Sequence, residues 1–346
     1  MTEHIQSEIK GGVGHITLNR PEALNALTLD MIEALDACIT DYAEDGNVKM
    51  VLVTSASEKA FCAGGDVKAV AVASKAHNDG ASVGETLFST LFRKEYELNT
   101  KIHNFEKPYV SIIGGLCMGG GVGISAHGSH RILTKNASFA MPEVKIGFFP
   151  DVGVAHLLSN MKTGMGEYLG LTGARINADD MMYLGLGTHM IDEEGVSHLI
   201  ENLTSLDWSR ADTNSLLNST LVNYCENYAG ASDLEARASN VVAQFSKGAL
   251  SDILPVLDNL EALCPLSLKI TFDHIKNAKG KALEEVIVKD YRLSQFFMRH
   301  PDFYEGVRAL LIDKDNAPKW TSSFDAIGDD IYTQAINAFE GEDLDV

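Results

Sequence analysis

KPYVSIIGGLCMGGGVG, at Lys107–Gly123, is the stretch of sequence that decides the fold. Its apolar run from Tyr109 to Gly114 predicts a strand, and a cluster of glycines follows it. Glycine at the start of a helix lets a backbone N–H approach a ligand, and the helix dipole favours negative charge there. We therefore expect the Gly120 amide to donate to an anion. Taken alone, such a glycine run has an alternative explanation, namely tight turns or close packing.

The chain before and after this stretch alternates short strand patterns with helical ones. His15–Asn19, Met50–Ser55 and Arg131–Thr134 read as strands, and Thr28–Tyr42 reads as a helix. This rhythm predicts an α/β protein built from stacked βαβ units.

A different pattern begins after Asp192, where long amphipathic stretches lack convincing strands. They lie at Leu216–Tyr228, Ser232–Ser246 and Leu283–Met298. We therefore predict a core at residues 1–195 and a C-terminal helical region at residues 196–346 that packs on it. Asn78–Ser82, which contains Gly80, is the expected flexible loop of the core.

Bulk composition excludes several classes of protein. The 346 residues are 45% hydrophobic and 22% charged, as in an ordinary globular protein, and the formal net charge is −20. That charge repels nucleic acid and anionic membranes, and no basic run offsets it. Five scattered cysteines form no Cys-x-x-Cys pair, no zinc-ligand spacing is visible, and the start of the chain lacks a signal or transit pattern. We expect a cytoplasmic protein with no metal and no membrane span.

Four motifs, taken in order, carry a family resemblance. LNRPEALNAL at Leu18–Leu27, KAFCAGGDV at Lys59–Val67, the stretch at Lys107–Gly123, and MPEVKIGFFPDVG at Met141–Gly153 resemble the crotonase (enoyl-CoA hydratase/isomerase) superfamily. The resemblance implies a spiral of ββα units. It also implies an acyl-CoA ligand whose thioester oxygen lies between two peptide N–H groups, carried over here to Ala63 and Gly120.

Acidic residues decide the branch of the superfamily. The MPE motif supplies Glu143, but the second glutamate that hydratases need, three residues past Gly120, is Gly123 here. Asp151, in FPDVG, is an acid where hydratases usually have a small residue. FPDVG and HPDFYEGVRALLIDKDNAPKW at His300–Trp320 resemble the 3-hydroxyisobutyryl-CoA hydrolase branch. The resemblance implies thioester hydrolysis with Glu143 as nucleophile or general base and Asp151 as its partner.

Two of the acids have ordinary alternative explanations. Asp151 follows a proline, where aspartate often forms a turn or caps a helix. Glu95 matches a substrate-contacting position of the hydrolase branch, but it could equally lie on a solvated helix face near Lys94 or Lys101.

The CoA moiety needs contacts on this acidic chain. Resemblance and local charge together suggest Arg20, Lys59, Ala60, Ala63, Gly65, Asp66 and Val67, with Lys68 nearby. CoA would arrive as part of the substrate, so no separate cofactor is expected. The superfamily also suggests a homo-oligomer, a trimer or hexamer.

Other conspicuous side chains have structural explanations. We expect His127 and His130 to be core or capping residues, and Cys62 and Cys117 to be packing residues. Phe296, Phe297 and Phe303 could wall an acyl pocket but more often such aromatics are core. Arg308 and Asp313 are expected to form an ion pair that docks the C-terminal region.

Three functions compete on the sequence alone. The first is hydrolysis of a short branched 3-hydroxyacyl-CoA, and the second is hydration or isomerisation of an enoyl-CoA, which Gly123 disfavours. The third is non-catalytic binding of CoA or RNA, as in the RNA-binding members of the superfamily, against which the net charge of −20 weighs.

Overall fold

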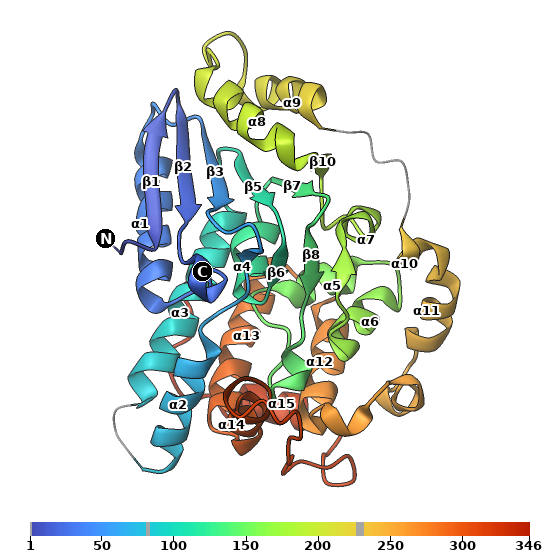
Figure 1. Cartoon of the computed structure of the whole chain (residues 1–346). Helices are drawn as coiled ribbons and strands as arrows, with labels where there is room; N and C mark the ends of the chain where they lie inside the picture. Colours follow the sequence, from blue (N-terminus) through green and yellow to red (C-terminus); the bar gives the residue numbers. More distant parts are fainter. Residues whose placement is uncertain (1, 81–83, 226–231) are drawn as a thin grey trace. The chain divides into compact units, whose positions relative to one another are not determined.

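A six-stranded sheet forms the first compact unit of the structure, a computed structural model that describes residues 2–80, 84–225 and 232–346. The strand order is β1-β2-β3-β5-β7-β10 (Figure 1), and every neighbouring pair is parallel except β1 with β2. The strands are β1 (Ile5–Lys10), β2 (Val13–Leu18), β3 (Met50–Ser55), β5 (Tyr109–Ile113), β7 (His130–Thr134) and β10 (His189–Ile191). The four predicted strands are present here, and β5 is buried at every position, as expected of a parallel strand covered on both faces.

A second, smaller sheet brings the two small-residue motifs side by side. It contains β4 (Ala60–Cys62), β6 (Leu116–Met118), β8 (Ser138–Ala140) and β9 (Ile176–Asn177). β4 runs parallel to β6, with Cys62 paired to Cys117. At Gly121 an added Cβ would lie 2.4 Å from the Cys62 carbonyl oxygen, so the helix start can approach β4 only because this residue is glycine.

Helices complete the first unit, which comprises residues 1–65, 98–139 and 176–236. They are α1 (Leu29–Glu44), α4 (Gly120–Ala126), α7 (Ala178–Tyr183), α8 (Glu193–Ser205), α9 (Thr213–Tyr224) and α10 (Asp233–Ala236). Leu199 and Leu203 of α8, with Leu217 and Leu221 of α9, pack on Leu52 and other sheet residues. This part of the predicted C-terminal region therefore belongs to the same unit as the large sheet.

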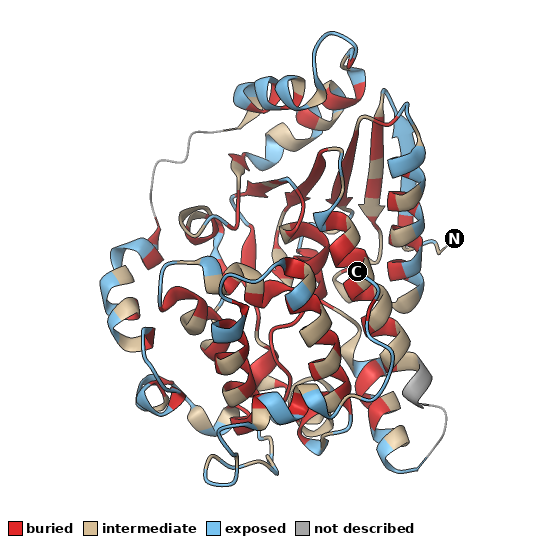
Figure 2. Cartoon of the chain, turned by 180° about the vertical axis from the view of Figure 1, so that it is seen from behind, coloured by how far each residue is buried: buried red, intermediate tan, exposed pale blue. Residues whose placement is uncertain are grey.

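The second unit comprises residues 66–97, 140–175 and 237–346 and is mainly helical. Its helices are α2 (Val67–Asn78), α5 (Val154–Asn160), α6 (Met165–Thr172), α11 (Ala238–Phe245), α12 (Pro265–Ala278), α13 (Leu283–Met298), α14 (Pro301–Val307) and α15 (Ile331–Asn337). α3 (Gly84–His103) contributes residues to both units. α12 packs on α5, α6 and α15, and α13 packs on α14 and α15. Buried residues follow the strands and the packed faces of the helices, whereas outer helix turns are exposed (Figure 2).

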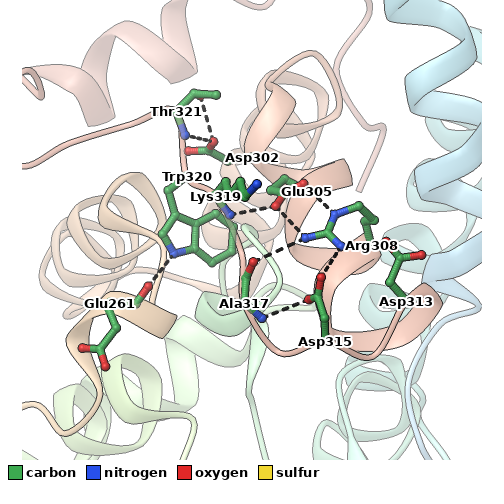
Figure 3. A network of polar contacts seen from close by, with 10 residues as sticks. All are labelled: Glu261, Asp302, Glu305, Arg308, Asp313, Asp315, Ala317, Lys319, Trp320 and Thr321. Atoms are coloured by element: carbon green, nitrogen blue, oxygen red, sulfur yellow. Dashed lines mark hydrogen bonds and ion pairs between the residues drawn. The ribbon is translucent and has the colours of Figure 1, made fainter.

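Arg308 organises the segment after α14, where the chain forms the π-helical turn η6 (Arg308–Ile312). Its guanidinium lies within 2.7–2.8 Å of carboxylate oxygens of Glu305, Asp313 and Asp315 (Figure 3). The predicted Arg308–Asp313 ion pair is confirmed. Glu305 also accepts a hydrogen bond from the Lys319 amide, so the segment from Asp313 to Lys319 is attached to α14.

Two sequence expectations concern boundaries. The loop predicted at Asn78–Ser82 begins at the last residue of α2, Asn78, and its residues 81 and 82 lie outside the described part of the chain. The domain boundary predicted after residue 195 stays a prediction; the two contact-defined units interleave in sequence and share no boundary there.

Candidate active site

Glu143 opens the segment that carries the candidate chemistry. It begins the short 3₁₀ helix η2 (Glu143–Lys145), and its carbonyl oxygen accepts hydrogen bonds from the amides of Ile146 and Phe148, each at 3.0 Å. The residue is only 7% exposed, and its Oε2 has no hydrogen-bond partner among the described residues. Burial, and then the charge of Asp151, raise the pKa of Glu143 well above the usual value. An unsatisfied buried carboxyl oxygen is the atom that a substrate or water would complete.

Gly147 allows the chain to turn between Glu143 and Asp151. Its φ is +69°, and an added Cβ would lie 2.2 Å from the carbonyl oxygen of Asp302, at the start of α14. Only glycine fits both the left-handed backbone and this close approach. The C-terminal motif HPDF therefore buttresses the MPEVKIGFF segment directly.

Asp151 is held by a tyrosine rather than serving as a helix cap. Its Oδ2 accepts a hydrogen bond from the Tyr96 hydroxyl at 2.7 Å, whereas α5 begins after Gly153 without a side-chain cap. Burial raises the pKa of Asp151 to about 7; the Tyr96 hydrogen bond opposes this shift, and the charge of Asp290 adds to it. The side chain is therefore poised to exchange a proton near neutral pH.

Glu95, on α3, is the third acid of this group. It is 3% exposed, and its Oε1 has no hydrogen-bond partner among the residues that the structure describes. The alternative, a solvated helix face, is wrong for this residue, since Lys94 pairs with Glu97 at 3.7 Å and Lys101 pairs with Asp36. Burial, and then Asp151, raise the pKa of Glu95 to about 8. Asp151 thus interacts electrostatically with both glutamates.

Phenylalanines that neighbour these acids in sequence belong to a cluster of aromatic rings. The Phe148 ring lies 5.5–5.6 Å from the rings of Phe92, Phe297 and Phe303, and 4.7 Å from that of Phe149. Phe297 and Phe303 are fully buried in this cluster, which agrees with the core explanation for them. A carboxyl group beside such rings exchanges water for a medium in which its ionised form is disfavoured.

Three residues of this site were not predicted from the sequence. They are Tyr96, Asp290 on α13 and His274 on α12. Asp290 accepts hydrogen bonds from the Gly153 amide at 2.7 Å and from His274 Nε2 at 2.5 Å. One signal was present, because Asp290 lies on the apolar stripe of its helix, one turn after Val286.

The two predicted backbone donors lie in the first unit, and one of them needs correction. The Ala63 amide already donates to the Leu24 carbonyl oxygen at 3.0 Å, so the prediction that it is an oxyanion donor does not hold in the structure. The Gly64 carbonyl accepts from the Leu27 amide at 2.8 Å. Because the peptide bond is trans, the Gly65 N–H points the opposite way, away from Leu27.

Gly65 and Gly120 are therefore the donor pair that this part of the chain offers. An added Cβ on Gly64 would lie 3.8 Å from the Gly120 nitrogen, so the two loops approach each other closely. Gly120 is the first residue of α4, where the N–H has no partner within the helix. Among the described residues, neither amide has a hydrogen-bond acceptor.

The remaining candidates have the structural surroundings expected of them. Buried His130 contacts Ser129 and Asn218, and buried His127 ends α4. Ser125, on the same helix, donates to the Gly121 carbonyl at 2.7 Å. Burial raises the pKa of Cys117 to about 12, which disfavours the thiolate and agrees with a packing role.

The proposed CoA contacts differ in accessibility. Arg20 donates to the Ala26 carbonyl at 2.9 Å and Ala60 is buried. Lys59 and Lys68 are exposed. Four residues of the loop are partly exposed, namely Ala63, Gly65, Asp66 and Val67. In the described part of the chain, no helix is both long and apolar enough to cross a bilayer.

A comparison with protein-family models decides the affiliation. The model described as enoyl-CoA hydratase/isomerase matches residues 13–335. The chain belongs to this family. Its curated relatives include the 3-hydroxyisobutyryl-CoA hydrolases, named as mitochondrial, of Danio rerio and Homo sapiens. The former is 39% identical and the match covers 96% of this chain and 89% of the relative; the latter is 39% identical over 92% and 84%.

Two solved structures confirm the fold class. A carnitinyl-CoA dehydratase from Mycobacterium thermoresistibile superposes with a TM-score of 0.86 at 31% identity, covering 99% of this chain and 98% of that one. An enoyl-CoA hydratase from Rhodobacter sphaeroides gives 0.84 at 30% identity, covering 96% and 97%. The predicted crotonase-like α/β core with helices in its C-terminal region is thus confirmed.

Proposed function

We propose that this chain hydrolyses a short branched 3-hydroxyacyl-CoA thioester, with 3-hydroxyisobutyryl-CoA as its substrate. The observation that carries the proposal is the buried group of Glu143, Asp151 and Glu95, in which two carboxyl oxygens have no partner among the described residues and every pKa is raised. The names of the curated relatives support the same reaction. Three adjacent acids suit chemistry that needs one ionised carboxylate and one protonated partner at neutral pH.

Glu143 acts on the thioester carbonyl carbon by one of two routes. As a nucleophile, its carboxylate would form a mixed anhydride and expel CoA thiolate, and water would then cleave the anhydride. As a general base, it would take a proton from the water that attacks the carbonyl. Asp151 would protonate the departing thiolate sulfur or hold the 3-hydroxyl of the acyl group. Glu95 would contact the substrate.

Backbone amides supply the second requirement, which is stabilisation of the tetrahedral oxyanion. We assign the two donors to Gly65 and Gly120, in place of Ala63 and Gly120, because the Ala63 amide is already occupied. One such donor is worth about 10²–10³ in rate.

The CoA moiety would bind through Arg20, Lys59 and the loop at Ala60–Val67. The cations would offset its phosphates on a chain of net charge −20. CoA enters as part of the substrate, so the proposed reaction uses no cofactor and no metal.

Release of free thiol from 3-hydroxyisobutyryl-CoA, followed with a thiol reagent, tests the proposal. We expect steady release by the wild-type protein, with faster turnover than on straight-chain acyl-CoAs lacking a 3-hydroxyl. Release no faster than the uncatalysed background would reject the proposal.

Hydration of an enoyl-CoA is the second candidate, favoured by the names of the two solved structures, a dehydratase and a hydratase. Gly123 on α4 disfavours it, since the position where hydratases carry their second glutamate has no side chain. The two candidates separate cleanly, because hydration of crotonyl-CoA changes its absorbance and releases no thiol.

The biological setting is part of the same proposal. The reaction fits valine catabolism, and the assembly would be a trimer or hexamer. The cytoplasmic location stays a prediction, and the relatives' names point to mitochondria instead. Light scattering of the purified chain and imaging of a tagged copy test the assembly and the location.

A further inference from the structure

Asp290 lies directly behind the loop that carries Asp151. It is completely buried on α13, and both of its carboxylate oxygens are used. Oδ2 accepts from the Gly153 amide at 2.7 Å, and Oδ1 accepts from His274 Nε2 at 2.5 Å. Burying a carboxylate costs free energy, and removing one of its partners would leave a buried charge without compensation. Asp290 therefore holds the Gly153 amide and the His274 ring in place.

The loop that Asp290 holds has an unfavourable backbone. Val152 has φ of +52° and Gly153 has φ of +73°, although a β-branched residue strongly disfavours that region. A residue in such a conformation costs on the order of 1–3 kcal/mol and persists only where the surroundings impose it. The Gly153–Asp290 hydrogen bond is one such constraint, two residues from Asp151.

His274 extends the support to the other end of the loop. Its Nδ1 lies 3.0 Å from the Tyr332 hydroxyl on α15, so Asp290, His274 and Tyr332 form one buried chain of hydrogen bonds. The His274 ring also meets the Phe149 ring edge-on, with centroids 5.7 Å apart. Phe149 precedes the Pro150–Gly153 loop and Gly153 ends it. α12 therefore contacts one end of the loop through His274, and α13 holds the other end through Asp290.

We propose that Asp290 is a positioning residue for thioester hydrolysis: supported by His274 and Tyr332, it fixes the Pro150–Gly153 loop in the conformation that presents Asp151 to the substrate. The inference rests on the proposed function and adds a layer that the reacting groups do not include. Asp290 touches no reacting atom and acts through the loop alone.

Charge gives Asp290 a second effect on Asp151. After burial, the charge of Asp290 contributes to the raised pKa of Asp151, while the Tyr96 hydrogen bond opposes it. Replacing Asp290 by a neutral residue should therefore lower the pKa of Asp151. The titratable and charged groups around the Asp151–Asp290 pair are Glu95 and Tyr96 of α3, Glu143 of η2, Asp273 and His274 of α12, Lys289 of α13 and Tyr332 of α15.

Asp290→Asn tests both effects together, since asparagine keeps the shape but has one acceptor for the two donors, Gly153 N–H and His274 Nε2–H, and carries no charge. We expect kcat to fall about 10²-fold with little change in KM, as for a small misplacement of a reacting group. The limb of the pH profile that reports Asp151 should move to lower pH. A merely structural role would change neither the pH profile nor the ratio of kcat to KM effects. Glu285→Gln, on the exposed side of α13, is the matched control and should leave both unchanged.

Tyr332→Phe keeps the test decisive if Asp290→Asn fails to fold, because only a terminal hydroxyl is lost. It should lower kcat by a smaller factor, roughly threefold to tenfold, at unchanged KM. Wild-type kcat and wild-type pH profile in the folded variants would overturn the proposal.

Amide exchange at the loop gives a readout that does not depend on the reaction. The Gly153 amide should be protected in the wild type and exchange at least about tenfold faster in Asp290→Ala. Unchanged exchange would contradict the positioning role. If instead the wild type releases no thiol while exchange behaves as expected, the proposed substrate fails and the loop support stands.

Discussion

Glu143, Asp151 and Glu95 are acids that the fold removes from water and places among aromatic side chains. Each has a raised pKa whose first cause is burial, and Asp151 interacts with both glutamates. Protons in such a group belong to the group and not to one residue. Burying acids in this way opposes their ionisation, and perturbed carboxyl groups of this kind gather at functional sites.

Asp151→Asn tests the partner acid at this scale. We expect turnover of 3-hydroxyisobutyryl-CoA to fall about 10²-fold or more, because the amide neither donates nor releases a proton as the carboxyl group does. CoA binding should be retained in calorimetry. Asp79→Asn, at an exposed carboxyl paired with Lys75, is the control and should leave turnover unchanged. Equal rates for all three proteins would remove Asp151 from the mechanism.

Glu95→Gln should stabilise the protein at neutral and alkaline pH. The pKa of Glu95 is raised to about 8 in the fold, so its contribution to stability is complete at acid pH and is lost as pH rises towards and past 8. Glutamine removes that loss. The difference in Tm between variant and wild type should be small at pH 4 and grow to at least about 2 °C at pH 8, where about 1 kcal/mol corresponds to roughly 2–4 °C. A difference that shrinks with rising pH would contradict the assignment.

Sequence reasoning at this scale identified acids by their motifs and missed what only the fold can place. MPE and FPDVG located Glu143 and Asp151. The choice between the Ala63 and Gly65 amides depends on the pairing of residues 24–27 with residues 63–65, which the sequence does not specify. His274 and Tyr96 reach the site from helices distant in sequence.

Among the elements, the turn between η2 and α5 depends most on one residue. Gly147 has a left-handed φ, and the carbonyl oxygen of Asp302 in α14 occupies the space that a Cβ would need. The turn therefore connects the position of Glu143 to the packing of α14.

Gly147→Ala should lower both stability and turnover. The added methyl group strains the backbone and collides with the Asp302 carbonyl, which costs at least about 1–3 kcal/mol. Gly248→Ala is the control, since an added Cβ there meets nothing within 4 Å. Thermal unfolding and thiol release measure both variants. A Gly147 variant as stable and active as the Gly248 variant would show that the turn tolerates displacement.

Elements with strong periodicity were predicted with good boundaries. β3 and α13 occupy the predicted residues, Met50–Ser55 and Leu283–Met298. The helix predicted at Ser232–Ser246 is instead two, because α10 ends at Ala236 and α11 begins at Ala238. α9 starts earlier than predicted, since Asp212 caps it through the Ser215 amide.

For the whole molecule, family resemblance predicted the fold class, which the solved structures confirm. The sequence did not predict that each compact unit draws on three separate segments. Such interleaving arises from long-range pairing, for example of β4 with β6, which local patterns do not encode.

The net charge of −20 makes RNA binding a clear negative prediction. We expect no retention on immobilised RNA at low salt, because long-range repulsion opposes approach to a polyanion. A basic RNA-binding protein run alongside verifies the column. Retention that is lost as salt is raised would support the non-catalytic alternative.

Glu143→Gln gives the most direct test of the central claim. The claim is that a buried carboxylate at this position either attacks a thioester carbonyl or activates the water that attacks it. We predict that thiol release from 3-hydroxyisobutyryl-CoA falls by about 10²–10⁴ relative to wild type while CoA still binds with wild-type affinity. A variant that releases thiol at the wild-type rate would contradict the account.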